Sequence, residues 1–411
     1  MPRIFASSRL MLPASVTSLW PVIACDQFTS DPSYWERVNA QVGEAPSALR
    51  LVLPEIYLEE DLESQDARIA SIHTTMQKYL TDGTLHSLDD GYVYVERQLQ
   101  SGAVRRGLVG VIDLEAYDAA ADSCACVRPT ERTVPERIPP RMRVRQNAKL
   151  EMTHVLLFAD DPTDTILGCL ESRKPSLPCL YDMDLMENGG HITGYAVTGE
   201  AKKAVDTILD SYEDTRRSQT SAAPLLYAVG DGNHSLATAK ACYEACKAHS
   251  SVETQRIARY AMVEVINLRD ASLQFEPIHR ILTSTDPELL LSAMKKNICA
   301  SHGYPLPWHS GKQSGTLYLD PSLGALPISI LQSFLDTWLE SHPGKIDYIH
   351  DEDALLALAE KPNSIGFLLP VIDKEHFFSA ILQDGVFPRK TFSIGHAREK
   401  RYYMEARIIQ A

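Results

Sequence analysis

Residues 225–240 read LLYAVGDGNHSLATAK, and this stretch decides the prediction of the fold and of the site. The apolar run Leu225–Val229 predicts a buried strand, and the residues from Ser235 onward are good helix formers. A tight loop with two glycines joins the two elements. A joint of this kind presents backbone N–H groups at the positive end of a helix dipole, which suits an anion such as a phosphate.

The loop also places an acid and an imidazole beside that anion. We expect Asp231 to bind Mg²⁺ or to activate an acceptor, and we expect His234 to stabilise transferred charge. The alternative is that Asp231 is an ordinary turn residue and that His234 caps the helix. The predicted phosphate contacts of the loop are Gly230, Gly232, Asn233 and Ser235.

Six arginines gather between residues 128 and 145 of a chain that is otherwise acidic. The guanidinium fork matches phosphate and carboxylate oxygens, so this segment is a second candidate anion site. Arg128 is predicted to neutralise a phosphate, and Glu131 is a further candidate base. The apolar residues of the segment 126–148 recur with neither a helical nor a strand period, which predicts a long loop. We interpret the arginines beyond Arg132 as solvated surface residues.

Two later segments add candidate phosphate contacts. His279 and Arg280 lie between apolar residues, which would hold both side chains in place, although a purely structural histidine is an equal alternative. Arg389 and Lys390 follow a proline in a segment that also contains glycines, which predicts a shaped loop. We keep two alternatives for these two residues: a contact with phosphate, and a structural clasp that holds this loop against another domain.

The composition limits the class of protein. The chain has 411 residues and a formal net charge of -14, and this acidic surplus argues against a nucleic-acid partner. No apolar stretch approaches the length needed to cross a bilayer, so no membrane partner is expected. Eight cysteines without a regular framework, and no signal peptide, predict reduced thiols and a cytoplasmic protein. The expected partner is a small-molecule substrate, and the oligomeric state stays open.

Strand and helix patterns alternate through most of the chain, which predicts a mixed α/β fold with mixed sheets and helices. Tyr92–Leu99 and Arg106–Leu114 predict two strands joined by a turn, and therefore a hairpin. We expect two domains. The first, over residues 1–283, is an α/β core that carries the Gly230–Ser235 loop. The second, over residues 284–411, is an α/β segment that packs back on the core.

Several separate motifs follow one another along the chain: Cys25-Asp26-Gln27-Phe28-Thr29-Ser30, Arg128-Pro129-x-Glu131-x-Thr133, Gly230-Asp231-Gly232-Asn233-His234, Pro277-Ile278-His279-Arg280, Phe387–Gly395 and Glu399–Arg407. With these motifs in this order, the chain resembles the family of uncharacterised proteins called domain of unknown function 1015, or DUF1015. The family's loop reads closer to Asp-Gly-His-His-Arg, so that here Asn233 stands at the first His and Ser235 at the Arg. Arg128 or Arg280 could replace that arginine in space.

The Asp-Gly-x-His loop is also similar to the nucleotide loop of the ParB/sulfiredoxin-like superfamily, which includes free-serine kinases. This resemblance implies a ParB/sulfiredoxin-like core, a nucleotide (ATP or ADP) with Mg²⁺, and phosphoryl transfer to a small hydroxyl-bearing metabolite. The alternatives are a non-catalytic nucleotide sensor, a ParB-like adaptor and a small-molecule phosphate-ester hydrolase. Whether the chain is an enzyme stays open at this point.

Overall fold

The computed structural model of the chain describes residues 3–152, 155–219, 223–247, 249–395 and 397–410. The chain divides into two compact units. Unit 1 comprises Met1–Pro129, Thr133–Leu273 and His396–Ala411, and unit 2 comprises Thr130–Arg132 and Gln274–Gly395. This division differs from the predicted boundary at residue 283, because the chain enters unit 2 earlier and its last residues belong to unit 1.

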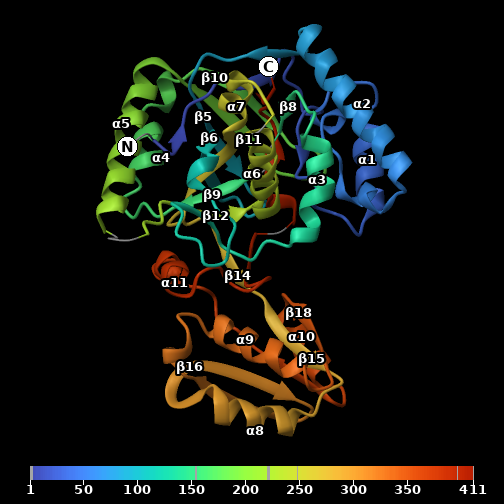
Figure 1. Cartoon of the computed structure of the whole chain (residues 1–411), viewed down its shortest axis with the longest axis vertical. Coiled ribbons are helices and arrows are strands. Elements are labelled where there is room, and N and C mark those ends of the chain that lie inside the picture. Colours follow the sequence, from blue (N-terminus) through green and yellow to red (C-terminus); the bar gives the residue numbers. More distant parts are fainter. Residues whose placement is uncertain (1–2, 153–154, 220–222, 248, 396, 411) are drawn as a thin grey trace. The chain divides into compact units, whose positions relative to one another are not determined.

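Unit 1 is built on a mixed sheet, which has nine strands in the described residues (Figure 1). The strand order is β10-β11-β5-β6-β13-β9-β12-β7, with β1 beside β6. The predicted mixed α/β fold and the hairpin of β5 and β6 are confirmed. The strands are β1 (Phe5–Ala6), β5 (Tyr92–Gln98), β6 (Val104–Asp113), β7 (Val127–Pro129), β9 (Leu156–Ala159), β10 (Cys179–Asp184), β11 (His191–Val197), β12 (Tyr227–Asp231) and β13 (Tyr260–Asn267).

Apolar residues cover both faces of this sheet, because successive side chains of a strand point to opposite sides. On one face, Leu108, Leu157 and Val229 form a core with α4 (Thr165–Glu171), α5 (Gly199–Gln219) and α6 (Asn233–Lys247). On the other face, Val95, Val109 and Met262 form a core with α1 (Pro32–Val42) and α2 (Leu62–Thr81). Figure 1 shows α5 on one side of the sheet and α1 and α2 on the other.

The C-terminal segment is part of the second core. Tyr402, Tyr403 and Met404 are buried there, and the indole N–H of Trp20 donates to the carbonyl of Met404 at 2.9 Å. Among the residues that the structure describes, three short antiparallel pairs of strands hold the N-terminal and C-terminal segments within unit 1. They are β2 (Met11–Pro13) with β4 (Leu85–Ser87), β21 (Tyr402–Tyr403) with β3 (Val22–Ile23), and β22 (Arg407–Ile408) with β8 (Leu150–Glu151).

The predicted long loop over residues 126–148 is wrong in its second half, because α3 (Ile138–Arg145) is a helix. Prolines stand in its first turn, where a missing N–H does no harm. The helix has no fully buried residue. Its sequence therefore lacks the repeat of apolar residues every three to four positions that would have predicted a helix. It lies instead against α6 and uses its arginines in ion pairs.

Unit 2 contains an antiparallel sheet with the strand order β17-β16-β19-β15-β18. Its buried residues include Leu282, Leu306 and Leu331. The strands are β14 (Phe275–Pro277), β15 (His279–Thr283), β16 (Cys299–Ser310), β17 (Gln313–Leu319), β18 (Lys345–Ile349), β19 (Ser364–Phe367) and β20 (Phe392–Ile394). The helices are α8 (Pro287–Asn297), α9 (Pro327–Leu339), α10 (Glu352–Ala359) and α11 (Phe377–Asp384).

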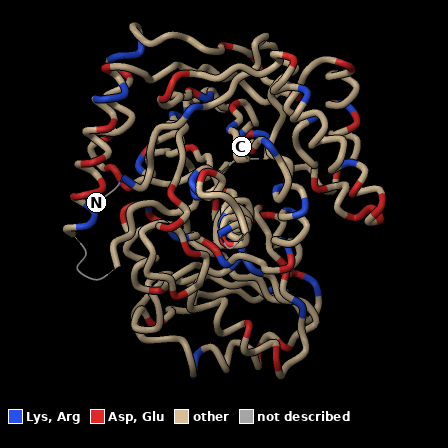
Figure 2. Tube along the Cα trace, turned by 45° about the horizontal axis from the view of Figure 1, so that its top comes forward, with Lys and Arg blue, Asp and Glu red and all other residues tan. Residues whose placement is uncertain are grey.

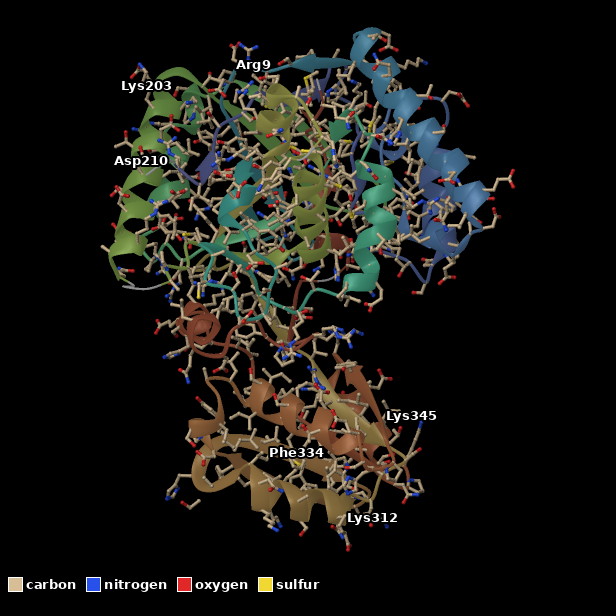
Figure 3. All side chains as sticks on the ribbon, viewed as in Figure 1. Arg9, Lys203, Asp210, Lys312, Phe334 and Lys345 are labelled. Atoms are coloured by element: carbon tan, nitrogen blue, oxygen red, sulfur yellow. The ribbon has the colours of Figure 1, made fainter. Side chains whose placement is uncertain are left out.

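Charged residues of both signs are spread along the chain in each unit (Figure 2). Lys203 and Asp210 point outward from α5 (Figure 3), and their side chains are 73% and 56% exposed. The outer face of this helix is therefore solvated. Among the described residues, no helix combines the length and the apolar character that a bilayer crossing requires.

Candidate functional site

The loop between β12 and α6 is a tight turn that needs glycine. Gly232 has φ +80°, and a Cβ there would lie 2.9 Å from the Cα of Val155. A Cβ on Gly230 would lie 2.4 Å from the ring of Phe158. The strand therefore leads directly into α6, and the first N–H groups of this helix lack acceptors within the helix. The predicted strand-loop-helix joint is confirmed.

Asp231, at the end of β12, is paired with a lysine from the C-terminal segment. Its Oδ2 lies 3.2 Å from Nζ of Lys400, and both side chains are 18% exposed. Its Oδ1 accepts the N–H of Gly232 at 2.9 Å. The carboxylate is thus oriented by one charge partner and one backbone donor.

His234 is held as a neutral imidazole. The N–H of Val134 donates to its Nε2 at 3.1 Å, which assigns the ring proton to Nδ1. Burial, and then the charges of Arg141 and Arg137, lower the pKa of His234 to about 4. At neutral pH the ring is therefore a hydrogen-bond donor through Nδ1 and carries no charge.

Cationic side chains gather near the first turn of α6, where Asp231 is paired with Lys400 and Glu55 with Arg141. Lys400 contacts Asp231, and the effect of Arg141 and Arg137 on His234 places two guanidiniums near the same turn. These charges add to the positive end of the helix dipole. Oδ1 of Asn233, the first residue of α6, is buried without a hydrogen-bond partner in the part of the chain that is described.

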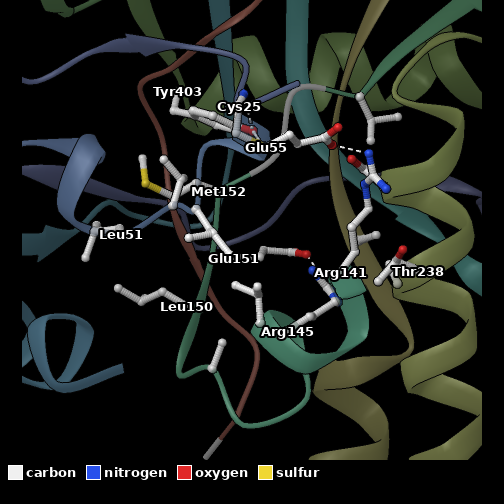
Figure 4. Close-up of a pocket in the computed structure, with 18 of the residues that line it drawn as sticks. Cys25, Leu51, Glu55, Arg141, Arg145, Leu150, Glu151, Met152, Thr238 and Tyr403 are labelled. Carbon is white, nitrogen blue, oxygen red and sulfur yellow. Dashed lines mark hydrogen bonds and ion pairs between the residues drawn. The ribbon is translucent and has the colours of Figure 1, made fainter. Parts of the chain in front are cut away.

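A cavity of about 130 Å³ opens beside the first two turns of α6 (Figure 4). Ser235 and Thr238 of α6 line it, with Arg141 of α3 opposite. Most of the remaining wall is aliphatic, including Leu51, Leu53, Leu58, Met76, Val144 and Met152. The cavity therefore offers an apolar chamber next to a polar helix terminus.

Ion pairs form the polar wall of this cavity. Arg141 is paired with Glu55, and Arg145 lies 2.5 Å from Glu151 (Figure 4). The interpretation as solvated surface residues is wrong for Arg141, Arg143 and Arg145, because carboxylates far away in the sequence bind them. Arg137, in contrast, is exposed, as predicted. Another wall is formed by Cys25, whose Sγ accepts the hydroxyl of Tyr403 at 3.0 Å. Burial raises the pKa of Cys25 to about 12, so its thiol stays protonated.

Arg128 belongs to unit 1, and its guanidinium donates hydrogen bonds to backbone carbonyls. It is 6% exposed and donates to the carbonyls of Ala125 and Ala223, both at 2.7 Å. It is not among the residues that line the cavity. These contacts join two segments of the chain and are sufficient to explain the burial of the side chain.

The other predicted residues lie in unit 2, where they contact one another. Glu131 accepts the N–H groups of Lys390 at 3.2 Å and Thr391 at 3.0 Å, and burial raises the pKa of its carboxyl. Arg280 is fully buried and donates to the carbonyl of Arg389 at 3.2 Å. This residue also donates to Oε1 of Gln332 and to the carbonyl of Ile278.

His279 has a separate environment in unit 2. Its Nδ1 accepts the N–H of Leu369 at 3.0 Å, and burial lowers the pKa of the ring. Lys390 has φ +54° and its ammonium lies 5.2 Å from the centre of the Tyr348 ring. The shaped loop predicted around Arg389 and Lys390 thus exists, and Glu131 holds it by its backbone.

Sequence reasoning did not select Lys400, Arg137 or Arg141 for the site. Lys400 is one cation among several in the C-terminal segment, and only the return of this segment to the sheet brings it to Asp231. Arg141 and Arg137 belong to the arginine-rich stretch, which is the signal that could have found them.

The described residues contain no group of three or more His, Cys, Asp and Glu side chains arranged to hold a metal ion. The carboxylate of Asp231, the predicted Mg²⁺ ligand, is engaged by Lys400 and Gly232. These residues do not fit a protein-built metal cage, which requires several free oxygen ligands.

The fold and the site define a mixed α/β protein with a candidate anion site at the head of a central helix. Residues 7–383 match the family model described as "Protein of unknown function (DUF1015)", and the chain belongs to the DUF1015 family. The resemblance predicted from the motifs is thereby confirmed, although Phe387–Gly395 and Glu399–Arg407 follow the matched region. None of the curated proteins compared with the chain matches it.

Three solved structures show a remote likeness. A free serine kinase in complex with AMP is 11% identical, covers 72% of this chain and 90% of its own, and has a TM-score of 0.38. A conserved hypothetical protein from Pyrococcus furiosus is 11% identical over 74% and 95%, with a TM-score of 0.36. SbnI from Staphylococcus aureus, truncated at its C-terminus, is 9% identical over 72% and 85%, with a TM-score of 0.37. At these TM-scores the likeness carries no argument about fold or activity.

Proposed function

We propose that unit 1 binds the phosphates of a nucleotide at the N-terminus of α6 and transfers a phosphoryl group to a small hydroxyl-bearing metabolite. The observation that supports this most directly is the meeting of Asp231 and Lys400 at the head of α6. An acid, a cation and a row of helix N–H groups converge there, and phosphoryl transfer depends mainly on positioning and charge stabilisation.

In this proposal the phosphates lie against the loop of Gly230, Gly232, Asn233 and Ser235. The N–H groups of the first turn donate to phosphate oxygens, and the ammonium of Lys400 neutralises their charge. The neutral His234 adds a hydrogen bond from Nδ1. The apolar cavity beside Ser235 and Thr238 would then hold an uncharged part of the bound nucleotide or acceptor.

Asp231 is the proposed base. Its carboxylate would accept the proton of the acceptor hydroxyl while the hydroxyl oxygen bonds to the terminal phosphorus of the nucleotide. The bond between that phosphorus and the leaving phosphate oxygen breaks in the same step, and the nucleotide leaves with one phosphate fewer (ADP from ATP, or AMP from ADP). We expect Mg²⁺ to enter with the nucleotide as part of the substrate, where it would offset phosphate charge. Glu131 takes no part in the proposed reaction, because backbone N–H groups of unit 2 donate to its carboxylate.

Calorimetric titration with ATP, ADP, AMP and pyrophosphate, each with Mg²⁺ or with EDTA, tests the binding. We expect the wild-type protein to bind ATP or ADP and Lys400→Met to lose at least about tenfold in affinity, equal to 1.4 kcal/mol. Lys203→Met is the matched control, since that lysine lies on the solvated face of α5. No binding of any nucleotide, or equal losses in both variants, would overturn the proposal.

Phosphorus NMR of ATP with a panel of hydroxyl-bearing metabolites tests the transfer. A new phosphate-ester signal that Asp231→Asn abolishes, while ATP still binds, is the expected result. ATP that binds and stays intact with every acceptor would favour the alternative of a nucleotide sensor. A small-molecule substrate as partner, without nucleic acid or membrane, and a cytoplasmic location remain predictions.

A further inference from the structure

Two buried arginines stand side by side on the sheet of unit 1. Arg97 of β5 and Arg105 of β6 are direct cross-strand partners, and they are 2% and 5% exposed. Cross-strand partners on one face lie close together, so two positive side chains share one buried place. Val109 and Glu264 are on the same face, as the pairing of β6 with β13 shows.

These two guanidiniums are incompletely satisfied. Nη2 of Arg97 donates to the carbonyls of Gly189 and Arg398, and Nη1 of Arg105 donates to the carbonyl of Glu399 at 3.0 Å. In contrast, Nε and Nη1 of Arg97 and Nε of Arg105 are buried without an acceptor among the residues that the structure describes. Within the same ranges, no ion pair joins either arginine to a carboxylate.

This arrangement is energetically unusual. A buried charge without an ion-pair partner is destabilising, and two like charges at one place increase the penalty. The ring of Tyr402, whose centre lies 4.7 Å from Cζ of Arg97, and the charges of Glu264 and Glu399 offset part of it. The carboxylate of Glu264, on this face, lies 3.2 Å from Arg401. Burial and the charge of Arg105 lower the pKa of Arg97 to about 10, so the side chain still carries its charge at neutral pH. Unsatisfied buried donors in a native fold indicate a missing partner.

The arginine pair adjoins the candidate site along the C-terminal segment. The carbonyls of Arg398 and Glu399 accept from the pair, and the next residue, Lys400, binds Asp231. Residues 398–400 therefore connect the two places within unit 1. An anion that replaces the two carbonyls at the guanidiniums would move the residue that carries the site lysine.

We propose that Arg97 and Arg105 form an anion clamp for a phosphate group, with residues 398–400 as its cover. The three unsatisfied N–H donors supply the hydrogen bonds, and the planar forks match phosphate oxygens. The inference that this phosphate is carried by the nucleotide or its product rests on the proposed function. The clamp itself does not, because it would bind inorganic phosphate as well.

Inorganic phosphate is therefore the probe, measured by calorimetry and by thermal unfolding against chloride at equal ionic strength. We expect phosphate to raise the melting temperature of the wild-type protein, and Arg105→Gln to lose at least about tenfold in phosphate affinity. Without phosphate, Arg105→Gln should melt at the wild-type temperature or above, because one of two repelling charges is gone. A purely structural arginine would give the opposite result, a lower melting temperature with phosphate binding unchanged.

Arg106→Gln is the matched control, since this neighbour points to the opposite face and is paired with Asp164 at 2.9 Å. It should bind phosphate as the wild type does. Equal phosphate binding by Arg105→Gln and the wild type, or a wild-type response no larger than that to chloride, overturns the clamp. ATP titrated into the same variants separates the two proposals. Phosphate binding that depends on Arg105, in a protein that binds no nucleotide, would support the clamp and contradict the proposed function.

Discussion

The ammonium of Lys400 lies 3.2 Å from the carboxylate of Asp231, and so the C-terminal segment is joined to the loop at the head of α6. The pair lies at the place where helix N–H groups are free to bind an anion. A phosphate that arrives there would compete with Asp231 for the lysine. The free carboxylate would then become available as a base, so the ion pair couples ligand binding to the release of Asp231.

Replacing Lys400 should weaken this site with a modest loss of stability. Both partners are 18% exposed, so we expect Lys400→Met to lower the free energy of unfolding by about 1 kcal/mol. Urea unfolding monitored by circular dichroism measures this change. Lys203→Met should change stability by less than about 0.5 kcal/mol, as exposed ion pairs do. A Lys400→Met protein that is as stable as the wild type and binds nucleotide equally well would show that the ion pair has no role.

Gly232 should tolerate alanine far less well than a glycine in an open turn. Gly232→Ala adds a Cβ at φ +80°, at 2.9 Å from the Cα of Val155, and we expect it to lower stability by about 2–4 kcal/mol. Gly83→Ala is the control, because Gly83 has φ +79° with no atom within 4 Å of the added Cβ. It should lower stability by only about 1 kcal/mol. Equal losses in urea unfolding would mean that backbone conformation alone, and not packing on Val155, determines the need for glycine.

His234 should make the protein less stable as the pH falls from about 6.5 to about 4. Its pKa is lowered to about 4 in the folded protein, from an ordinary value near 6.5. The unfolded chain then binds more protons than the folded protein in this window, so stability increases with pH there. With allowance for solvent screening, we expect about 1–2 kcal/mol from this residue. Its contribution is complete above pH 6.5.

Urea unfolding at pH 7.5 and pH 5 should therefore show a smaller difference for His234→Gln than for the wild-type protein. His86→Gln serves as the control, because His86 is exposed. If both variants keep the full wild-type pH dependence, another titrating group is responsible for it.

Glu131 should act in unit 2 through hydrogen bonding and not through charge. Its carboxylate accepts the N–H groups of Lys390 and Thr391, and Glu131→Ala would leave both donors without that acceptor. We expect a loss of about 2–4 kcal/mol for Glu131→Ala, and about 1 kcal/mol or less for Glu131→Gln, which keeps a carbonyl oxygen. Hydrogen exchange of residues 388–392 should increase only in the alanine variant. Equal effects of Ala and Gln would show that the charge near Arg280 is what matters.

The sequence was informative where the pattern is local. The alternation of Tyr92–Leu99 predicted β5, and the apolar run before Gly230 predicted β12, although β12 begins two residues later than expected. Asp61 precedes α2, and its carboxylate accepts the N–H of Ser64 at 2.9 Å, as the N-cap residue of a helix does. Local backbone preferences determine such features, and so they can be read from a single chain.

The site could be predicted only in part, because its partners come from distant segments. The Asp231 loop was found from its own residues, but the approach of Lys400 depends on the path of the C-terminal segment. Arg97 and Arg105 look like ordinary polar positions of two alternating strands, and their burial results from the segment that covers them. Arg128 and Arg280 were predicted from their charge, whereas the structure shows that backbone carbonyls bind both.

The return of residues 396–411 to unit 1 has a consequence for synthesis of the chain on the ribosome. Proteins emerge from their N-terminus, and most domains fold as soon as they are complete. Here the segment that buries Trp20, supplies Lys400 and covers Arg97 emerges after unit 2 has been made. The unit that begins first must therefore wait for residues that follow unit 2, and a chain that stalls before residue 396 would leave part of its apolar core exposed and prone to aggregate.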